Sequence, residues 1–270
     1  MKKHFYFLLL AMVAMVSCKK EEKLSYLFEG KIRTITDARN AAAPSTFFCF
    51  YDSITQKLSR IEMTYDTTKA TRDGVFVITY QDDFVYINKN LKIKVNQLQI
   101  LEMFSVDTTS HTDYSMLKVY LTGNKVDSIY EPGVLLANSN IRSNHFEYTN
   151  GNCTKLTMSW DSNSLFIPNG RLKDTLNFTF TNSKNKNQAW YQIPNMLVTV
   201  GFTNVTAFLL QMAGYHMLPV NNNLIDSFTN RNSTTKYSYE FFDNQNIKKV
   251  TMEKTEGAVK TTSYQSMTYF

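Results

Sequence analysis

Hydrophobic and polar residues alternate along most of the chain, and a period of two predicts β-strands with one buried and one solvated face. Residues 91–104 alternate less regularly and predict two short strands or one bent strand, and residues 189–193 are a further candidate strand. The clearly alternating segments are residues 27–35, 46–51, 58–65, 74–80, 84–87, 116–122, 126–130, 146–149, 152–158, 172–181, 236–242, 247–253 and 261–270. Short turns separate most of them, so the sequence predicts an antiparallel sheet.

One segment, residues 203–213, has the period of a helix instead. Its apolar positions are spaced by three and four residues and are Val205, Phe208, Leu209 and Met212. Thr203 is a candidate N-cap and Gly214 a candidate residue for the turn after the helix. The apolar stripe needs a partner, and the simplest is the concave face of a curved sheet.

One hairpin pattern occurs three times, in residues 48–63, 146–158 and 239–252. Each copy has two aromatic residues one position apart, a turn with Asn or Asp, and then a basic residue, an aliphatic residue, a polar residue and Met. The Asn150-Gly151 pair is the strongest of these turns, because both residues accept a positive φ at low cost. No linker rich in Pro, Gly or Ser divides the copies, so the repetition predicts one sheet of similar hairpins.

The N-terminus is typical of a secretory signal peptide covering residues 1–17. Lys2 and Lys3 precede an apolar run over residues 5–16, which is shorter than the about 20 residues that a membrane-spanning helix needs. The run ends in Met15-Val16-Ser17-Cys18, which resembles the lipobox of bacterial lipoproteins. The resemblance implies that the Cys18 thiol receives a diacylglycerol and that Cys18 becomes the new N-terminus. In the alternative, an ordinary signal peptide, cleavage after Ser17 would require a small residue where Met15 stands.

Residues 18–26 then form a lipidated start and a tether. Within it, Lys20, Glu21 and Glu22 resemble the surface-export signal of Bacteroidota lipoproteins, a basic residue followed by acidic ones. That resemblance implies the outer face of the outer membrane. Charges in a tether also serve solubility alone, which leaves the periplasm-facing leaflet open.

Composition adds two constraints. Aromatic residues make up 14% of the chain, which supports β-sheet. The formal net charge of +6 falls to +4 when Lys2 and Lys3 leave with the signal peptide, and the remaining basic residues are not clustered. Nucleic acid is therefore not an expected partner. Cys49 and Cys153 are either a disulfide of an exported protein or two buried thiols.

The sequence contains none of the common catalytic, phosphate-binding or metal-binding motifs. His111, His145 and His216 lie far apart in the chain, and the adjacent Asp82 and Asp83 are typical of a turn. We therefore expect no enzyme activity, no cofactor and no metal. Trp160 and Trp190 are either a sugar-stacking platform or ordinary core residues, and the second interpretation is favoured.

The two later hairpins have the forms YEY-NGN-x-x-KL and YEF-DNQN-x-x-KV, and Leu218-Pro219 precedes the last hairpins. Together with the lipoprotein start and the late helix, these features resemble the DUF4595 family of uncharacterised lipoproteins. The resemblance covers most of residues 46–270 and implies a porin-like curled sheet. It supplies no catalytic residues.

A C-terminal Phe is also common in outer-membrane barrels, and the chain ends in Phe270. A strand that faces lipid should be apolar on its outer side over about 10 positions. Neither face of residues 262–270 meets this condition, so Phe270 is interpreted as an ordinary strand residue.

The sequence thus predicts an all-β fold, a curled antiparallel sheet that is open or closed into a barrel, as a single domain over residues 27–270. We expect a lipid-anchored outer-membrane protein with a non-catalytic binding or structural role, facing the cell surface. A carrier or sensor of a hydrophobic ligand, held between sheet and helix, is the alternative. Glycan, peptide and lipid remain possible ligands, and the sequence predicts no oligomeric state.

Overall fold

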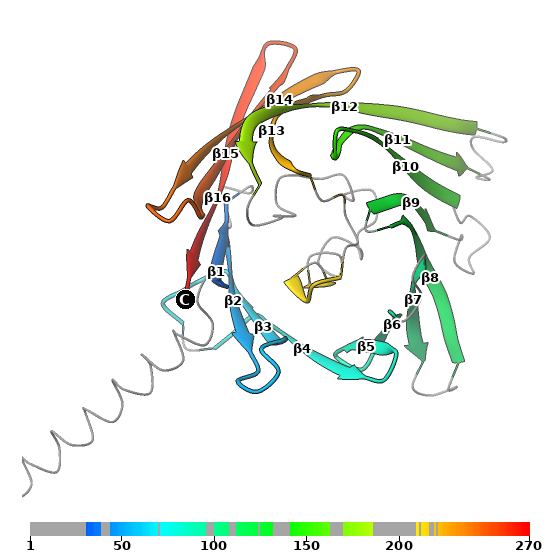
Figure 1. Ribbon diagram of the computed structural model, residues 1–270, viewed down its shortest axis with the longest axis vertical. Helices are drawn as coiled ribbons and strands as arrows, with labels where there is room; N and C mark the ends of the chain where they lie inside the picture. The colour runs from blue at the N-terminus through cyan, green and yellow to red at the C-terminus, as the bar shows by residue number, and fades with distance from the viewer. Residues whose placement is uncertain are drawn as a thin grey trace, which may run out of the picture.

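The computed structural model describes residues 31–38, 44–69, 71–95, 100–107, 112–123, 125–131, 141–162, 170–185, 209–210, 212–215, 219 and 221–270. Within these residues, sixteen strands form one closed antiparallel barrel (Figure 1). The strands are β1 (Ile32–Asp37), β2 (Ser45–Tyr51), β3 (Leu58–Thr64), β4 (Gly74–Gln81), β5 (Phe84–Ile87), β6 (Leu91–Lys94), β7 (Ile100–Asp107), β8 (Thr112–Thr122), β9 (Lys125–Glu131), β10 (Ile141–Thr149), β11 (Asn152–Ser162), β12 (Gly170–Lys184), β13 (Asn223–Thr229), β14 (Ser233–Phe241), β15 (Ile247–Glu256) and β16 (Val259–Tyr269). The predicted all-β antiparallel fold is confirmed, and the sheet is closed rather than open.

Closure takes place where the two ends of the sheet meet. Strand β1 pairs with β16, with Ile35 opposite Met267, and its other edge pairs with β2, with Ile35 opposite Phe47. The Phe270 amide donates a hydrogen bond to the Lys31 carbonyl at 3.1 Å, just beyond the paired strands. Because β1 is paired on both sides, this seam leaves no open edge to recruit another strand.

The two faces of the barrel wall differ in chemistry, because alternate residues of a strand point to opposite sides. In β15, Val250 and Met252 are buried, whereas Glu253 is exposed and Lys249 and Thr251 are partly exposed. Buried apolar side chains from around the whole barrel form one core, whose largest fully buried wall members are Ile35, Leu58, Ile61, Ile93, Leu117, Ile129 and Leu156. The apolar face of the wall therefore points into the lumen.

The outer face carries ion pairs between neighbouring strands. Their shortest N–O distances are 3.1 Å for Lys118–Glu102, 2.6 Å for Lys155–Glu147 and 3.4 Å for Lys249–Glu240. A membrane-spanning barrel has the opposite arrangement, with an apolar outer band and a polar interior. A basic residue on a lipid face costs about 2–4 kcal/mol at the bilayer midplane. The described wall is therefore built for water outside and an apolar interior.

A short helix lies inside the ring of strands, as the yellow segment in Figure 1 shows. Its described residues are Leu209, Leu210 and Met212, and we call it the lumen helix. Leu209 and Met212 belong to the predicted apolar stripe and pack in the core, as expected. Leu210 is equally buried although it lies outside the stripe. The reason is that a helix inside a barrel meets wall on more than one side, whereas a helix on a sheet does not.

The structure differs from the sequence prediction at strand β13, because the sequence analysis assigns no strand to residues 223–229. Leu224 and Ile225 are adjacent and both buried, and the pairing of β13 with β12 shifts register between Thr179 and Phe180. This irregularity removes the period of two on which strand prediction depends. The sequence left two short strands or one bent strand open for residues 91–104. The structure has two strands there, β6 and β7.

The two cysteines of the barrel are free thiols. Cys49 lies on β2 and Cys153 on β11, and both are buried in the core. Burial raises the pKa of each thiol to about 12. Of the two alternatives that the sequence left open, the structure has the buried thiols, which are unreactive in this state.

Candidate functional site

The lumen and the end of the barrel where β1 begins form the candidate site. We call this end the N-terminal end. The even-numbered strands finish here, so the turns between β2 and β3, β4 and β5, β10 and β11, and β14 and β15 all lie at it. The segment that carries the lumen helix also leaves the wall and returns to it here, between β12 and β13.

The end of the lumen helix is well defined by backbone hydrogen bonds. The Ala213 amide donates to the Leu209 carbonyl at 2.9 Å, and the Tyr215 amide donates to the Leu210 carbonyl at 2.8 Å. Gly214 has a φ of +91°, in the left-handed region that glycine adopts without strain. The predicted helix stop at Gly214 is therefore confirmed, while Thr203, Val205 and Phe208 lie outside the described residues.

Asparagines fix the two ends of the segment between β12 and β13. We call them the asparagine cluster, and its members are Asn150, Asn152, Asn185, Asn221, Asn222 and Asn223. The Asn185 amide donates to the Asn222 carbonyl at 2.9 Å, so the two ends are bonded to each other. The Cys153 amide donates to Asn221 Oδ1 at 2.7 Å, which ties this junction to the turn between β10 and β11.

The asparagine cluster also explains why residue 151 is glycine. Gly151 has a φ of +80°, and a Cβ atom there would overlap the side-chain amide of Asn222. The backbone amide of Asn222 donates to the Gly151 carbonyl at 3.2 Å, and the backbone amide of Asn223 donates to Asn152 Oδ1 at 2.9 Å. The cluster thus uses its polar groups to hold the chain that leads to the lumen helix. The run of three asparagines at 221–223 is a sequence signal for this cluster, which was not predicted.

Five tyrosines near the N-terminal end point inward and bond to the wall. Each stands near the end of an even-numbered strand, and its hydroxyl donates to a carbonyl near the start of the preceding strand. The pairs are Tyr51–Ile32 at 3.1 Å, Tyr80–Leu58 at 2.8 Å, Tyr148–Val126 at 2.7 Å, Tyr239–Ile225 at 2.7 Å and Tyr269–Ile247 at 3.0 Å. Burial raises the pKa of the phenols of Tyr51, Tyr80, Tyr148 and Tyr239. These five tyrosines, of which Tyr148 and Tyr239 belong to copies of the hairpin motif, therefore fasten adjacent strands through their hydroxyl groups.

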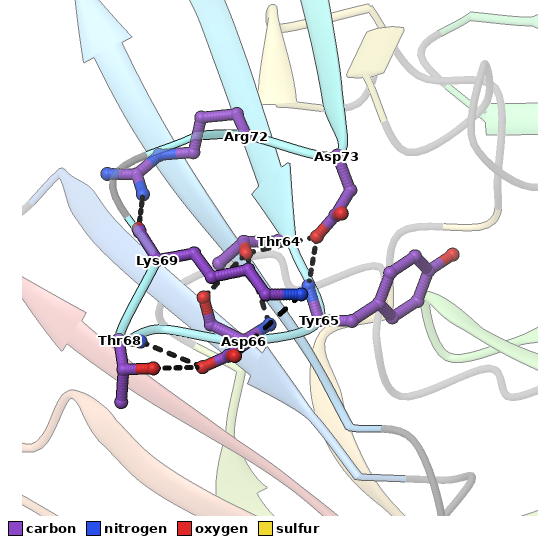
Figure 2. A network of polar contacts seen from close by, with 7 residues as sticks. All are labelled: Thr64, Tyr65, Asp66, Thr68, Lys69, Arg72 and Asp73. Atoms are coloured by element: carbon purple, nitrogen blue, oxygen red, sulfur yellow. Dashed lines mark hydrogen bonds and ion pairs between the residues drawn. The ribbon is translucent and has the colours of Figure 1, made fainter.

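The acidic residues at the opposite end of the barrel also serve structure (Figure 2). Asp66 Oδ1 accepts hydrogen bonds from the Thr68 hydroxyl at 2.6 Å and the Thr68 amide at 3.0 Å. Asp73 Oδ2 accepts from the Tyr65 amide at 2.7 Å and the Thr64 hydroxyl at 3.1 Å. These bonds lower the pKa of both carboxyl groups. The carboxylates shape the loop between β3 and β4, and the exposed Tyr65 ring points away from them.

Among the described residues, the structure does not bring the candidates His145 and Asp82 together. His145 is exposed on β10, and Asp82, with a φ of +50°, lies in the turn between β4 and β5 as predicted. No group of three potential metal ligands occurs among the described residues. The described helical residues include no helix long and apolar enough to cross a membrane. Trp160 lies in β11, and Trp190, His111 and His216 are outside the described residues.

The predicted lipidation and export residues, Cys18, Lys20, Glu21 and Glu22, are outside the described residues. The described chain begins at Lys31, whose ammonium group donates to the Gln56 carbonyl in the turn between β2 and β3. The described chain therefore enters the barrel at its N-terminal end.

Comparison with protein-family models and with curated proteins finds no match. Two solved structures are similar in fold. One is a porin-like protein from Bacteroides uniformis, with a TM-score of 0.56, 13% identity, and coverage of 88% of this chain and 98% of that one. The other is a porin-like protein from Bacteroides vulgatus, with a TM-score of 0.56, 11% identity, and coverage of 89% of this chain and 98% of that one. The chain therefore has the fold of these porin-like barrels.

Proposed function

We propose that this protein is a lipid-anchored cell-envelope protein, held at the outer membrane through Cys18, with a barrel that acts as a non-catalytic binding or structural module. The observation that carries the proposal is the polarity of the barrel wall, which is charged outside and apolar inside. Such a wall is suited to water, so attachment to a membrane requires a separate anchor. The lipobox-like sequence ending at Cys18 supplies one.

Two further features support this proposal. Two or three acyl chains hold a protein at a membrane almost irreversibly, because each buried methylene contributes about 0.8 kcal/mol. The similar solved barrels come from Bacteroides, in keeping with the Bacteroidota-type start and with the resemblance to DUF4595. Membership of that family is part of the proposal.

The anchor is tested by replacing Cys18 with Ser, together with Met15→Ala so that an ordinary signal peptidase can still cleave after Ser17, and by fractionating the cells; this variant is called the C18S protein. We expect the unaltered protein in the membrane fraction with acyl groups on its N-terminal peptide in mass spectrometry, and the C18S protein in the soluble fraction. Cys49→Ala is the matched control, because it removes a buried thiol elsewhere and should leave the protein in the membrane. A C18S protein that still sediments with membranes and carries no lipid contradicts the proposal.

Exposure at the cell surface is a separate part of the proposal and rests on Lys20, Glu21 and Glu22. Replacing the two glutamates with Ala should reduce labelling of intact cells by an antibody to the barrel while the protein stays in the membrane fraction. Lys23→Ala is the control, since it changes a tether charge outside the motif. Equal surface labelling of all three proteins would show that these charges do not direct export.

A second candidate function is a carrier or sensor of a hydrophobic ligand. The specific observation that favours it is the lumen helix, whose Leu209 and Leu210 side chains are enclosed by the apolar wall. Displacement of this helix would open an apolar cavity to a lipid-like molecule. Native mass spectrometry of the purified protein distinguishes the two functions: a co-purifying lipid of fixed mass supports the carrier, and a bare chain supports the binding or structural module.

A further inference from the structure

Apolar and basic side chains gather at the N-terminal end of the barrel, in the part formed by β1, β16 and the turns after β2 and β14. Ile54, at the tip of the turn between β2 and β3, is 90% exposed. Phe241 and Phe242 are 39% and 36% exposed at the turn between β14 and β15. We call Ile54, Phe241, Phe242 and Phe270, together with the basic residues Lys31, Arg33 and Lys57, the N-terminal rim.

Ring contacts hold these aromatic residues in fixed positions. The rings of Phe242 and Tyr269 meet edge to face with centroids 6.0 Å apart, and those of Tyr51 and Phe270 do the same at 6.1 Å. Phe241 stacks on Tyr239 at 6.3 Å. Tyr239 and Tyr269 are in turn bonded to the wall through their hydroxyl groups. The apolar surface of the N-terminal rim is therefore part of the barrel framework.

Cations lie directly beside this aromatic surface. The ammonium of Lys31 is 5.0 Å from the Tyr51 ring centroid, and the guanidinium of Arg33 is 5.7 Å from that of Phe270. Two carboxylates lie in the turns at this end: Asp52 accepts hydrogen bonds from Thr55 within its own turn, and the exposed Asp243 follows Phe242. Aromatic rings next to basic groups are the side chains that favour the interface between lipid headgroups and hydrocarbon.

The tether brings the same end of the barrel to the membrane. Lys31 follows Cys18 by 13 positions, and a chain of that length spans about 45 Å when extended and roughly 20 Å when flexible. A tether this short gives the attached surface an effective concentration on the order of millimolar. A weak contact is therefore enough to orient the barrel once the anchor is in place.

We propose that the N-terminal rim rests on the lipid headgroups of the membrane that holds the Cys18 anchor, with Ile54 and Phe242 at headgroup depth. The inference rests on the proposed anchor and adds an orientation to it. The barrel axis points away from the membrane, and the opposite end, with the turns between β3 and β4 and between β15 and β16, faces outward. The loop carrying Tyr65 in Figure 2 is then presented away from the bilayer.

The test compares two exposed apolar residues at opposite ends of the barrel. Ile54 and Val259, which is 63% exposed in the turn between β15 and β16, are each replaced by Cys in the lipidated full-length protein and labelled with an environment-sensitive fluorophore. Cys49 and Cys153 are buried, so they do not react in the folded protein. The proteins are placed in vesicles of phosphatidylethanolamine and phosphatidylglycerol that contain a lipid with a headgroup-depth spin label.

We expect the label at position 54 to be quenched several-fold more strongly than the label at position 259, and circular dichroism to show the same fold for both. If the protein floats with the vesicles but the two labels are quenched equally or hardly at all, the proposed orientation is wrong, while the proposed anchor is still supported. Protein that does not float overturns the anchor and the orientation with it. A third outcome is self-quenching of the label at position 54 that decreases when unlabelled protein is added. It would identify a second copy of the chain as the partner of the N-terminal rim, which also overturns the inference.

Discussion

The inner and outer faces of the barrel wall come from the same strands but follow opposite rules. Inside, apolar side chains such as Leu156 are enclosed, and polar groups such as the Tyr148 hydroxyl are bonded to backbone. Outside, Lys155 and Glu147 pair across neighbouring strands while remaining in water. A barrel of porin-like shape therefore need not have the polarity of a membrane barrel. The position of the charges decides which environment the wall suits.

The largest effect should come from placing a charge on the inner face. Leu156→Asp buries a carboxylate in the apolar core, whereas Thr157→Asp, one residue along, adds the same group to the outer face. We expect Leu156→Asp to abolish folding or cost more than about 4 kcal/mol, and Thr157→Asp to cost less than about 1 kcal/mol. Urea unfolding followed by circular dichroism measures both. Similar losses for the two variants would contradict the inside–outside assignment.

The buried thiols give the next largest effect, through pH. The pKa of Cys49 and of Cys153 rises from 9.0 to about 12 in the folded protein, so the unfolded chain loses these protons first. Stability should therefore be intact below pH 9 and decrease toward pH 12, by on the order of 3 kcal/mol per thiol at pH 11. Urea unfolding of the Cys49→Ala and Cys153→Ala double variant isolates the loss of stability caused by the thiols. The inner tyrosines still titrate in this variant, so the difference from the unaltered protein belongs to the two cysteines. If the unfolding free energy of the double variant decreases with pH as steeply as that of the unaltered protein, the result argues against buried thiols.

A smaller effect is expected from the inner tyrosines. Tyr148→Phe leaves the Val126 carbonyl without its side-chain donor and should cost about 1–2 kcal/mol. Tyr264→Phe is the matched change on the outer face, where the ring is exposed, and it should cost less than about 0.5 kcal/mol. Thermal unfolding of the two variants compares them directly. Equal midpoints would mean that the repeated hydroxyl bonds do not stabilise the N-terminal end.

The smallest effect concerns the outer ion pairs. Lys155→Gln removes the 2.6 Å contact with Glu147, but both side chains are well exposed. Solvent and salt screen such a pair, so the loss in unfolding free energy should be about 0.2–1 kcal/mol and should vanish at 1 M salt. A loss of several kcal/mol that persists at high salt would indicate that the outer face is shielded from water.

Much of the fold could be predicted from the sequence, because a period of two is a local signal. The hairpin at Asn150-Gly151 is an example, since its turn chemistry and its alternation agree. Closure of the barrel could not be predicted, because the pairing of Ile35 with Met267 joins the two ends of the sheet and leaves no local mark. Strand β13 was missed for the related reason that its adjacent buried residues, Leu224 and Ile225, interrupt the alternation.

The candidate site was less predictable than the fold. The helix stop at Gly214 follows from local chemistry and was found, but the burial of Leu210 depends on an enclosing wall. The N-terminal rim is assembled from residues as distant as Lys31 and Phe270, which only the closed barrel brings together. A single sequence shows these residues as scattered aromatic and basic positions, so their common surface is visible in the structure alone.

The central claim is that the wall suits water and that Cys18 alone holds the protein at the membrane. The most direct measurement is carbonate extraction and size-exclusion chromatography of the C18S protein in detergent-free buffer. We predict that it is released into the supernatant as a monodisperse protein with the circular dichroism of a β-barrel. A C18S protein that resists extraction, or that needs detergent to stay folded and dispersed, would contradict the account.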